Sequence, residues 1–443
     1  MIILIFLCFT ILILFLINKE IKQNKLKNVT ISLFWVFTYF YYITYFLNPL
    51  LLYLDDSLSL QIAKEPSSVY FIYSTLISSV YWLFAYIGFN RVVPSTNSYT
   101  LNLEISQFRL KLLSIVSILL FYFLLYEYII DFLVNSNRIN MFEYSDGNGL
   151  NTVLKSLYIY SFFFYIVYYL YSFNTKVKKF DKIGIFIFLS LILTIIFSTV
   201  ILGTRRNLAI LVFSILFLFV MKSKGEKHFS VYLLLGVILI TPFLSSIMQS
   251  IRYIIVDEFS LSIFISRVLE LNQIIVSTFE GHWLALYLEK TDLKEILLGK
   301  NILEPFSNFL NYVPRFLWEE KPYNLGILEM QYYLAPDSFN IKGKPTITLP
   351  STILVDIIYS FGLFAGLVVM YFIGSFLKYL TVLLEYQNNV VFIFIAVYIY
   401  INMFAFVRSG SAFIIGIIIP LIFMLFILKR KFVQKGVFNG KTK

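Results

Sequence analysis

Long apolar stretches separated by short polar segments run through almost the whole chain. An α-helix needs about 20 apolar residues to cross the hydrocarbon core of a bilayer, and most of these stretches approach that length. The short alternating segments of an outer-membrane barrel give a different pattern. We therefore predict an all-α polytopic integral membrane protein with about eleven transmembrane helices, forming a single domain over residues 1–443. The predicted spans are 2–17, 31–54, 67–90, 112–134, 153–173, 183–202, 207–221, 230–248, 353–377, 390–407 and 411–428.

Composition supports this class and excludes others. Of the 443 residues, 59% are hydrophobic and only 14% are charged. Soluble globular chains average about 45–50% apolar and 25% charged residues, so an ordinary soluble enzyme is excluded. A disordered chain is excluded by the same apolar content. One cysteine cannot form a disulfide scaffold within the chain.

The distribution of basic residues predicts the orientation of the chain. The first span lacks the basic start and small-residue cleavage site of a signal peptide, and four lysines follow it. Placing the N-terminus outside and the C-terminus in the cytoplasm puts 21 of the 36 basic residues on the inner side. Nine of the remaining 15 fall in one long loop, which the positive-inside rule does not count. The net charge of +11 is therefore an orientation signal, and no nucleic-acid partner is expected.

Residues 249–350 form one long segment between the eighth and ninth predicted spans, on the outer side. Long loops in compact proteins are usually functional or disordered, and this segment has helical patterning. Asp292 and Glu295 resemble a capping box for a short helix that ends near Gly299. Trp283 and Trp318 suit a membrane interface. We expect short interfacial helices that form a cap over the outer mouth of the bundle.

Arginine is concentrated on the predicted outer side, which holds seven of the ten arginines but only 15 of the 36 basic residues. The planar guanidinium holds phosphate or carboxylate bidentately, which lysine does not. Several of these cations lie in tight turns at the outer membrane edge, and two more lie between Pro314 and Pro322. We expect them to bind an anionic headgroup. The predicted binding residues are Arg205, Arg206, Arg252, Arg315, Lys321 and Arg408.

A simpler interpretation remains open for each of these cations. A single arginine could extend towards the interface, or could form a structural ion pair with a nearby acid. The acids considered for such pairs are Asp131, Asp257, Glu258 and Asp356.

Candidates for a general base are few. Nucleotide-binding loops and the common hydrolase motifs are absent from the sequence. The two histidines fall on opposite predicted sides, so no zinc cluster is expected. Glu280, His282 and Asp257 could serve as a base at the outer surface, although a solvated loop position is the more ordinary interpretation for Glu280 and His282. Glu127 and Asp131, one helical turn apart in the fourth span, indicate either proton coupling or a structural position near the outer interface.

Three short motifs and the long outer loop resemble the Wzy-type O-antigen or capsular repeat-unit polymerases of bacterial inner membranes. The motifs are the arginine turn at 203–206, the Pro-Arg-Phe-Leu-Trp and Lys-Pro run at 314–322, and the stretch 350–366. The last contains Asp356, Tyr359-Ser360-Phe361-Gly362 and Gly366.

The resemblance implies a GT-C-like glycosyltransferase that takes both substrates as undecaprenyl-diphosphate-linked oligosaccharides at the outer face of the cytoplasmic membrane. It would work without a nucleotide cofactor or an obligatory metal. Fixed arginines could neutralise the diphosphate leaving group. Membrane lipid, a chain-length regulator and a flippase are the implied partners, and the family supplies no base at a matching position.

Two other functions stay open. An O-antigen ligase would use the same donor with a lipid A-core acceptor and would need a histidine in the outer loop, for which His282 is the candidate. A polysaccharide flippase or other transporter would show paired halves, broken helices and charges at the middle of the membrane. The charges here gather at one face instead.

Overall fold

The computed structural model describes most of the predicted bundle and parts of the long outer segment. The described residues are 1–22, 32–54, 66–91, 103–135, 154, 157–175, 181–202, 207, 210–215, 218, 275, 280–310, 313, 317–318, 320, 327–338, 352–386 and 390–430.

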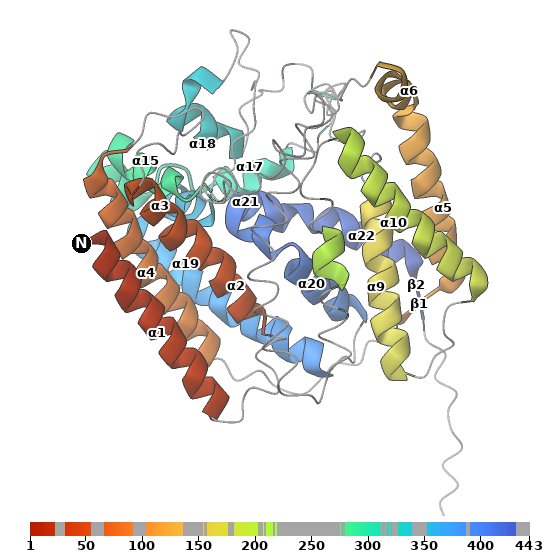
Figure 1. Cartoon of the computed structure of the whole chain (residues 1–443), viewed down its shortest axis with the longest axis horizontal. Coiled ribbons are helices and arrows are strands. Elements are labelled where there is room, and N and C mark those ends of the chain that lie inside the picture. Colours follow the sequence, from red (N-terminus) through yellow and green to blue (C-terminus); the bar gives the residue numbers. More distant parts are fainter. Residues whose placement is uncertain are drawn as a thin grey trace, which may run out of the picture.

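These residues are mainly helical, and the apolar helices identify a membrane protein (Figure 1). Five helices are long and apolar enough to cross a bilayer: Ile2–Lys19, Ser68–Arg91, Gln107–Leu124, Lys182–Thr199 and Ile353–Leu383. A bent pair, Val390–Ile401 with Met403–Gly410, would make a sixth span if both halves belong to one crossing. Of the eleven predicted stretches, 207–221 is described only in part, and 230–248 lies outside the described residues.

The long helices of the bundle have the following bounds. They are α1 (Ile2–Lys22), α4 (Ser68–Arg91), α5 (Gln107–Leu124), α9 (Leu157–Thr175), α10 (Lys182–Leu202) and α19 (Ile353–Tyr386).

Two predicted spans are not regular α-helices over their whole length. The second predicted span consists of α2 (Leu33–Tyr42), the π-helix η2 (Ile43–Leu47) and α3 (Asn48–Leu54). The fourth is divided at Leu125 between α5 and α6 (Tyr126–Asn135). The second span is helical over all of residues 33–54, as predicted, with a π-helical turn in its middle. The single helix expected over 112–134 was wrong at Leu125, because hydrophobic periodicity reports which residues are apolar and not where a helix breaks.

The last part of the bundle is also broken. Helices α20 (Val390–Ile401) and α21 (Met403–Gly416) meet at 72° around Asn402, and α22 (Ile418–Ile427) follows. Helix α21 has a second break at Gly410. Buried helix breaks in a membrane protein require other groups to satisfy the freed backbone atoms. At Asn402, the carbonyl oxygen of Tyr398 keeps its helical hydrogen bond from the backbone amide, at 3.1 Å, and accepts a second from the side-chain Nδ2, at 2.9 Å.

Helices α4 and α19 pack closely together over their length. A Cβ built on Gly88 would lie 2.0 Å from the carbonyl oxygen of Tyr371, and one on Gly374 would lie 1.9 Å from that of Ala85. Small residues allow helix backbones to approach closely in lipid, where burial of apolar side chains supplies little driving force for association. This contact fixes α19, whose first turns carry the polar residues described below.

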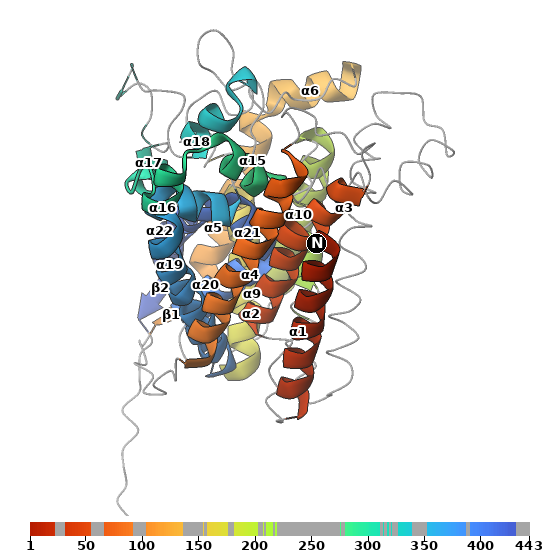
Figure 2. The same ribbon diagram turned by 90° about the vertical axis from the view of Figure 1, so that its left-hand side faces the viewer.

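The predicted outer segment contributes short helices, called the cap helices below, at one end of the bundle (Figure 2). They are α15 (His282–Lys290), α16 (Leu293–Leu298), α17 (Glu304–Leu310), α18 (Ile327–Leu334) and the 3-10 turn η3 (Pro336–Ser338). This bears out the expected short helices, and α16 starts and ends where the sequence predicted. Asp292 occupies its N-cap position but its side chain makes no cap hydrogen bond.

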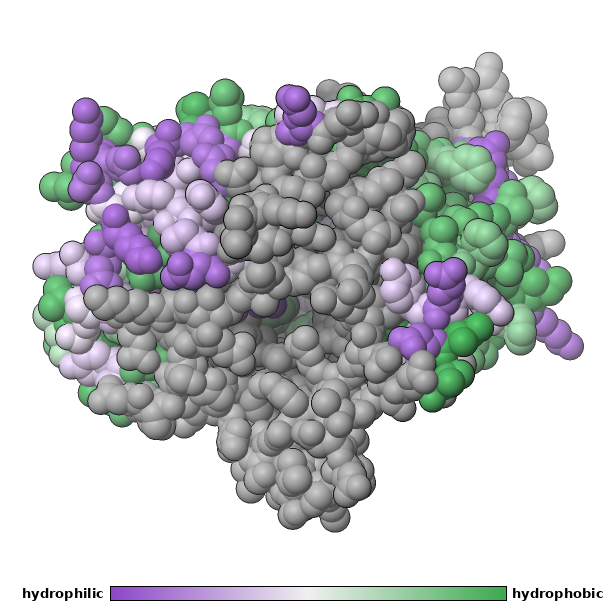
Figure 3. All heavy atoms as spheres, turned by 90° about the horizontal axis from the view of Figure 1, so that it is seen from above, coloured by the Kyte–Doolittle hydropathy of each residue, from purple (hydrophilic) through white to green (hydrophobic). Residues whose placement is uncertain are grey.

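Seen from that end, hydrophilic residues gather on the side that carries α15 and α18, whereas the side that carries α5 and α10 is hydrophobic (Figure 3). Helix α6 lies at the same end as α15–α18 and leaves the direction of α5 (Figure 2). Glu127 on α6 is exposed and Asp131 is half-buried. The structural interpretation of these two acids is therefore favoured over proton coupling inside a span.

A small sheet joins distant parts of the chain at the end of α5 that lies away from α6 (Figure 1). Strand β1 (Leu103–Ile105) pairs antiparallel with β2 (Leu428–Arg430), with Glu104 opposite Lys429. Arg109 donates hydrogen bonds from Nη1 to the carbonyl oxygens of Phe426, at 3.2 Å, and Leu428, at 2.9 Å. The sequence did not predict this sheet, because three-residue strands leave no alternating pattern to detect.

Candidate functional site

The first turns of α19 carry a row of polar residues on one helical face. Asp356 and Ser360 lie one turn apart, and both side chains are buried. The backbone amide of Asp356 donates to the carbonyl oxygen of Thr352 at 3.0 Å, so the acid lies within the first helical turn. A carboxylate is favoured near a helix N-terminus, where the backbone amides point at it. The helix then breaks at Gly362, whose φ is 77°.

Asp356 reaches across to the break in α21. Gly410 has φ 50°, and a Cβ built on it would lie 2.3 Å from Oδ2 of Asp356. Only glycine adopts this backbone conformation readily and leaves the space that the carboxyl group occupies. The break in α21 and the carboxyl group on α19 therefore fit each other.

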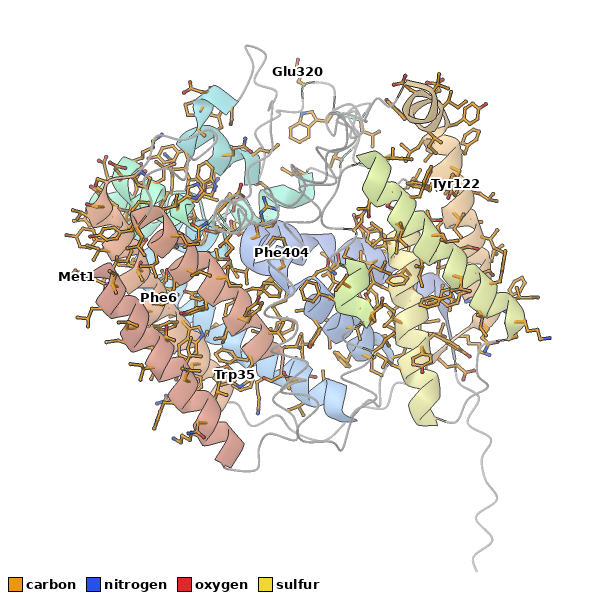
Figure 4. The ribbon with its side chains drawn as sticks, in the orientation of Figure 1. Met1, Phe6, Trp35, Tyr122, Glu320 and Phe404 are labelled. Atoms are coloured by element: carbon orange, nitrogen blue, oxygen red, sulfur yellow. The ribbon has the colours of Figure 1, made fainter. Side chains whose placement is uncertain are left out.

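Arg408 lies two residues before this break and forms an ion pair with Glu280. Its Nη2 is 3.0 Å and its Nε is 3.3 Å from Oε2 of Glu280. Side-chain exposure is 31% for Arg408 and 13% for Glu280, so the pair is only partly shielded from solvent. The ring of Phe404, one turn earlier on α21 (Figure 4), has its centroid 5.7 Å from the guanidinium carbon. Arg408 is thus oriented from two sides.

The backbone around Glu280 is held by the second span. Glu280 has φ 43°, which is uncommon outside glycine and costs free energy unless the surroundings enforce it. Gly281 presses against the π-helix η2, where a Cβ would lie 1.6 Å from the carbonyl oxygen of Thr44. π-Helical turns occur frequently at functional sites. Here η2 provides the surface on which Glu280 is turned towards Arg408.

A second acid, Glu304, lies beside Asp356. Glu304 is the first residue of α17 and its side chain is fully buried. The hydroxyl of Ser360 donates to Oε2 of Glu304 at 3.3 Å, and the Glu304 carboxyl also makes a hydrogen-bonding contact with Asp356. Burial, and then the charge of Asp356, hold the pKa of Glu304 far above its usual range. Glu304 is therefore a neutral carboxylic acid at neutral pH.

Glu329 on α18 links the residues around Glu304 to α19 through hydrogen bonds. It accepts two hydrogen bonds from Nδ2 of Asn301, each at 3.2 Å, and one from the hydroxyl of Tyr359 at 3.0 Å. The ammonium group of Lys300 makes a cation–π contact with the ring of Tyr333, with Nζ 3.8 Å from the ring centroid. These contacts tie α18 and the turn before α17 to α19, and they enclose Glu304.

His282 is buried at the start of α15, with 5% of its surface exposed. Burial lowers the pKa of its imidazole to about 3. A group that binds protons so weakly is a poor general base near neutral pH. The solvated loop position expected for Glu280 and His282 was wrong, because one is ion-paired and the other is enclosed.

The structure places only part of the predicted site. Arg408 and Glu280 come together, although the acids considered as partners for the arginines did not include Glu280. Asp356, from the motif at 350–366, lies next to them through Gly410. Six other predicted residues lie outside the described part of the chain: Asp257, Arg205, Arg206, Arg252, Arg315 and Lys321.

Glu304 and Glu329 were missed. The detectable signal for Glu304 was a lone acid in an apolar run, Ile302-Leu303-Glu304-Pro305-Phe306. A charged residue in such a run is usually either satisfied by a buried partner or functional. Glu329 left no comparable signal, because its partners come from two other segments.

Within the described residues, no group of three or more histidine, cysteine, aspartate or glutamate side chains could hold a metal ion. Comparison of the chain with protein-family models, curated proteins and solved structures gives no match. The interpretation of the site therefore depends on its own geometry and chemistry.

Proposed function

We propose that the protein polymerises polyprenyl-diphosphate-linked oligosaccharide repeat units into O-antigen or capsular polysaccharide, at the outer face of a bacterial cytoplasmic membrane. In the complete fold we expect about eleven spans in a GT-C-like arrangement. Such an enzyme must hold two lipid-linked substrates at the membrane surface and stabilise a diphosphate leaving group.

The observation that carries this proposal is the oriented, partly exposed guanidinium of Arg408. It lies at a helix break where the apolar bundle meets the cap helices. A fixed cation of this kind stabilises developing negative charge without reorganising during the reaction. The predicted partner cations in the turn at 203–206 and in the segment 314–322 would add to it. Glu280 would then exchange its partner for the incoming phosphate.

Apolar surfaces next to the site suit a long lipid tail. On α19, Phe364, Val368 and Phe372 recur every four residues and are all more than half exposed. Leu303 and Phe306 on the neighbouring turn and α17 are exposed to a similar degree. Exposed apolar rows that continue from a membrane helix onto cap helices offer a continuous surface to acyl or prenyl chains.

Transport is the second candidate, because the chain has helix breaks at Gly362, Asn402 and Gly410, and the last of these lies against the buried acid Asp356. Transporters build substrate sites from broken helices of this kind. A ligase has less support, since its candidate base, His282, is buried and weakly basic.

Deletion of the gene in its host, followed by gel analysis of surface polysaccharide, separates these functions. A polymerase deletion leaves a core that carries one repeat unit, whereas a ligase deletion leaves core alone. A flippase deletion removes surface repeat units and retains lipid-linked units on the cytoplasmic side. A normal ladder of polymer in a strain with no second polymerase would overturn the proposal.

A further inference from the structure

Two acidic side chains face each other in a region closed to solvent. Glu304 is fully buried and Asp356 is 3% exposed, and they come from a cap helix and a membrane helix. Oε1 of Glu304 receives no hydrogen bond from a donor among the described residues. Two carboxyl groups can hydrogen-bond to each other only when one of them carries a proton.

The charges around this pair do not remove the need for a proton. Glu329 on α18 adds a further acid, and the side chain of Tyr359 donates to it. Arg408 on α21 forms an ion pair with Glu280, which lies two residues before α15. Two like charges at hydrogen-bonding distance in a buried site cannot both be retained, so one carboxyl group binds a proton.

Asp356 links this proton to the position of Arg408. Its carboxyl group fills the space left by the missing side chain of Gly410, at the break in α21. Arg408 belongs to the last helical residues before that break. Because Oδ2 of Asp356 fills the space beside Gly410, a displacement of the Asp356 carboxyl group would shift the backbone that carries Arg408.

We propose that Glu304 and Asp356 share one proton and act together as positioning residues for Arg408. With the proton bound, a single negative charge lies against Gly410 and Arg408 is held beside Glu280. Loss of the proton forces the two carboxylates apart, which displaces the break and separates Arg408 from Glu280. The pair is thus a pH-sensitive element connecting the cap to the bundle, and it would keep the proposed anion site assembled only while the proton is bound.

The direction of the pH dependence follows from linkage. Burial and the neighbouring Asp356 raise the pKa of Glu304 in the folded protein. Between the unfolded and the folded pKa, the folded state binds more protons than the unfolded state, so stability falls as pH rises. The contribution is complete below the unfolded pKa and is lost as pH rises through the folded one.

The first test measures thermal unfolding of the full chain in lipid nanodiscs from about pH 5 to about pH 9. Glu304→Gln mimics the protonated acid and cannot lose its proton. We expect this variant to gain stability relative to the unaltered protein as pH rises, by a few degrees in Tm. Glu289→Gln, at an exposed position on α15, is the matched control and should shift Tm by a nearly constant amount. Parallel curves for the unaltered protein and Glu304→Gln would overturn the shared proton, and Asp356→Asn gives the same test if Glu304→Gln does not fold.

The second test measures the link to Arg408. A double-mutant cycle of Glu280→Gln and Arg408→Gln reports the coupling of that ion pair, with Tm as the readout. We expect the coupling to be lost at alkaline pH in the otherwise unaltered chain and to persist when Glu304→Gln is also present. Coupling that is independent of pH in both backgrounds would overturn the positioning role. No substrate enters either measurement, so failure of the proposed polymerase activity would leave both results interpretable.

Discussion

Gly299 and Gly362 meet backbone to backbone where α16 ends against the break in α19. A Cβ on Gly299 would lie 2.7 Å from the amide nitrogen of Gly362, and one on Gly362 would lie 2.6 Å from that of Gly299. Both residues have φ near 80°. The break frees the carbonyl oxygen of Tyr359, which accepts hydrogen bonds from the amides of Lys300 and Asn301. The cap is therefore fastened to the membrane helix through main-chain atoms.

Replacement of Gly362 by alanine should release this junction. A positive φ costs a residue other than glycine about 1–3 kcal/mol, and the clash with the end of α16 adds to that. We expect Gly362→Ala to lower Tm and to raise protease sensitivity in the cap segment. Ala365→Ser, on an exposed position one turn further along, is the control and should leave both nearly unchanged. An unchanged Tm for Gly362→Ala would contradict the close approach.

Arg408 should be needed for polymer formation and should not be replaceable by lysine. Lysine retains the charge but lacks the planar group that bonds through both Nε and Nη2. In a deletion strain, we expect Arg408→Ala to restore no ladder and Arg408→Lys to restore a weak one on polysaccharide gels. Arg91→Ala, an exposed arginine at the end of α4, is the control. A full ladder with Arg408→Ala would remove this arginine from the site.

Because of His282, the folded protein should lose stability as the pH is lowered. Its pKa falls from 6.5 to about 3 on burial, so the unfolded state binds more protons between these values and stability falls as pH is lowered. The loss between about pH 8 and about pH 5 is on the order of 2 kcal/mol. We expect His282→Phe to abolish this acid-side loss in thermal unfolding, whereas Trp283→Phe retains it. An acid-side loss that survives His282→Phe would show that the imidazole is not buried in solution.

The orientation of the bundle can be tested with cysteine labelling. Cys8 is the only cysteine, so Cys8→Ser gives a background without thiols. Lys300 is exposed, and the side chain of Lys429 is 50% exposed at the opposite end. We expect a membrane-impermeant maleimide to label Lys300→Cys in intact spheroplasts and to label Lys429→Cys only after lysis. The reverse result would invert the orientation predicted from the basic residues.

The sequence predicts the features that depend on composition and short-range pattern. Apolar length located the spanning helices, and Asp292 and Gly299 marked the ends of α16. The sequence also predicted an interruption at 408–410, between the spans 390–407 and 411–428. It did not predict the break at Gly362, because a glycine in an apolar helix is usually a packing residue. The role of each glycine depends on what lies opposite, which is Gly299 for Gly362 and Asp356 for Gly410.

For the candidate site too, the sequence predicts what depends on local pattern and not what depends on tertiary contacts. Arginine enrichment on one side indicated Arg408 without any knowledge of contacts. Its partner Glu280 and the buried acid Glu304 are far from it in the chain, and nothing in their spacing relates them. Burial, which sets the protonation of His282 and Glu304, is a property of the assembled fold. A pattern along the chain does not contain it.

The two strands β1 and β2 can pair only after almost the whole chain has been synthesised. Arg109 and Leu428, which are hydrogen-bonded beside this sheet, are separated by 319 positions. A ribosome adds about 5–20 residues per second, so the first partner waits roughly 15–60 s for the second. During that interval strand β1, at the start of α5, has no partner strand. A chain that terminates before β2 would therefore keep its early spans in the membrane without the strand that pairs with β1. Such a chain would be a substrate for membrane quality-control proteases.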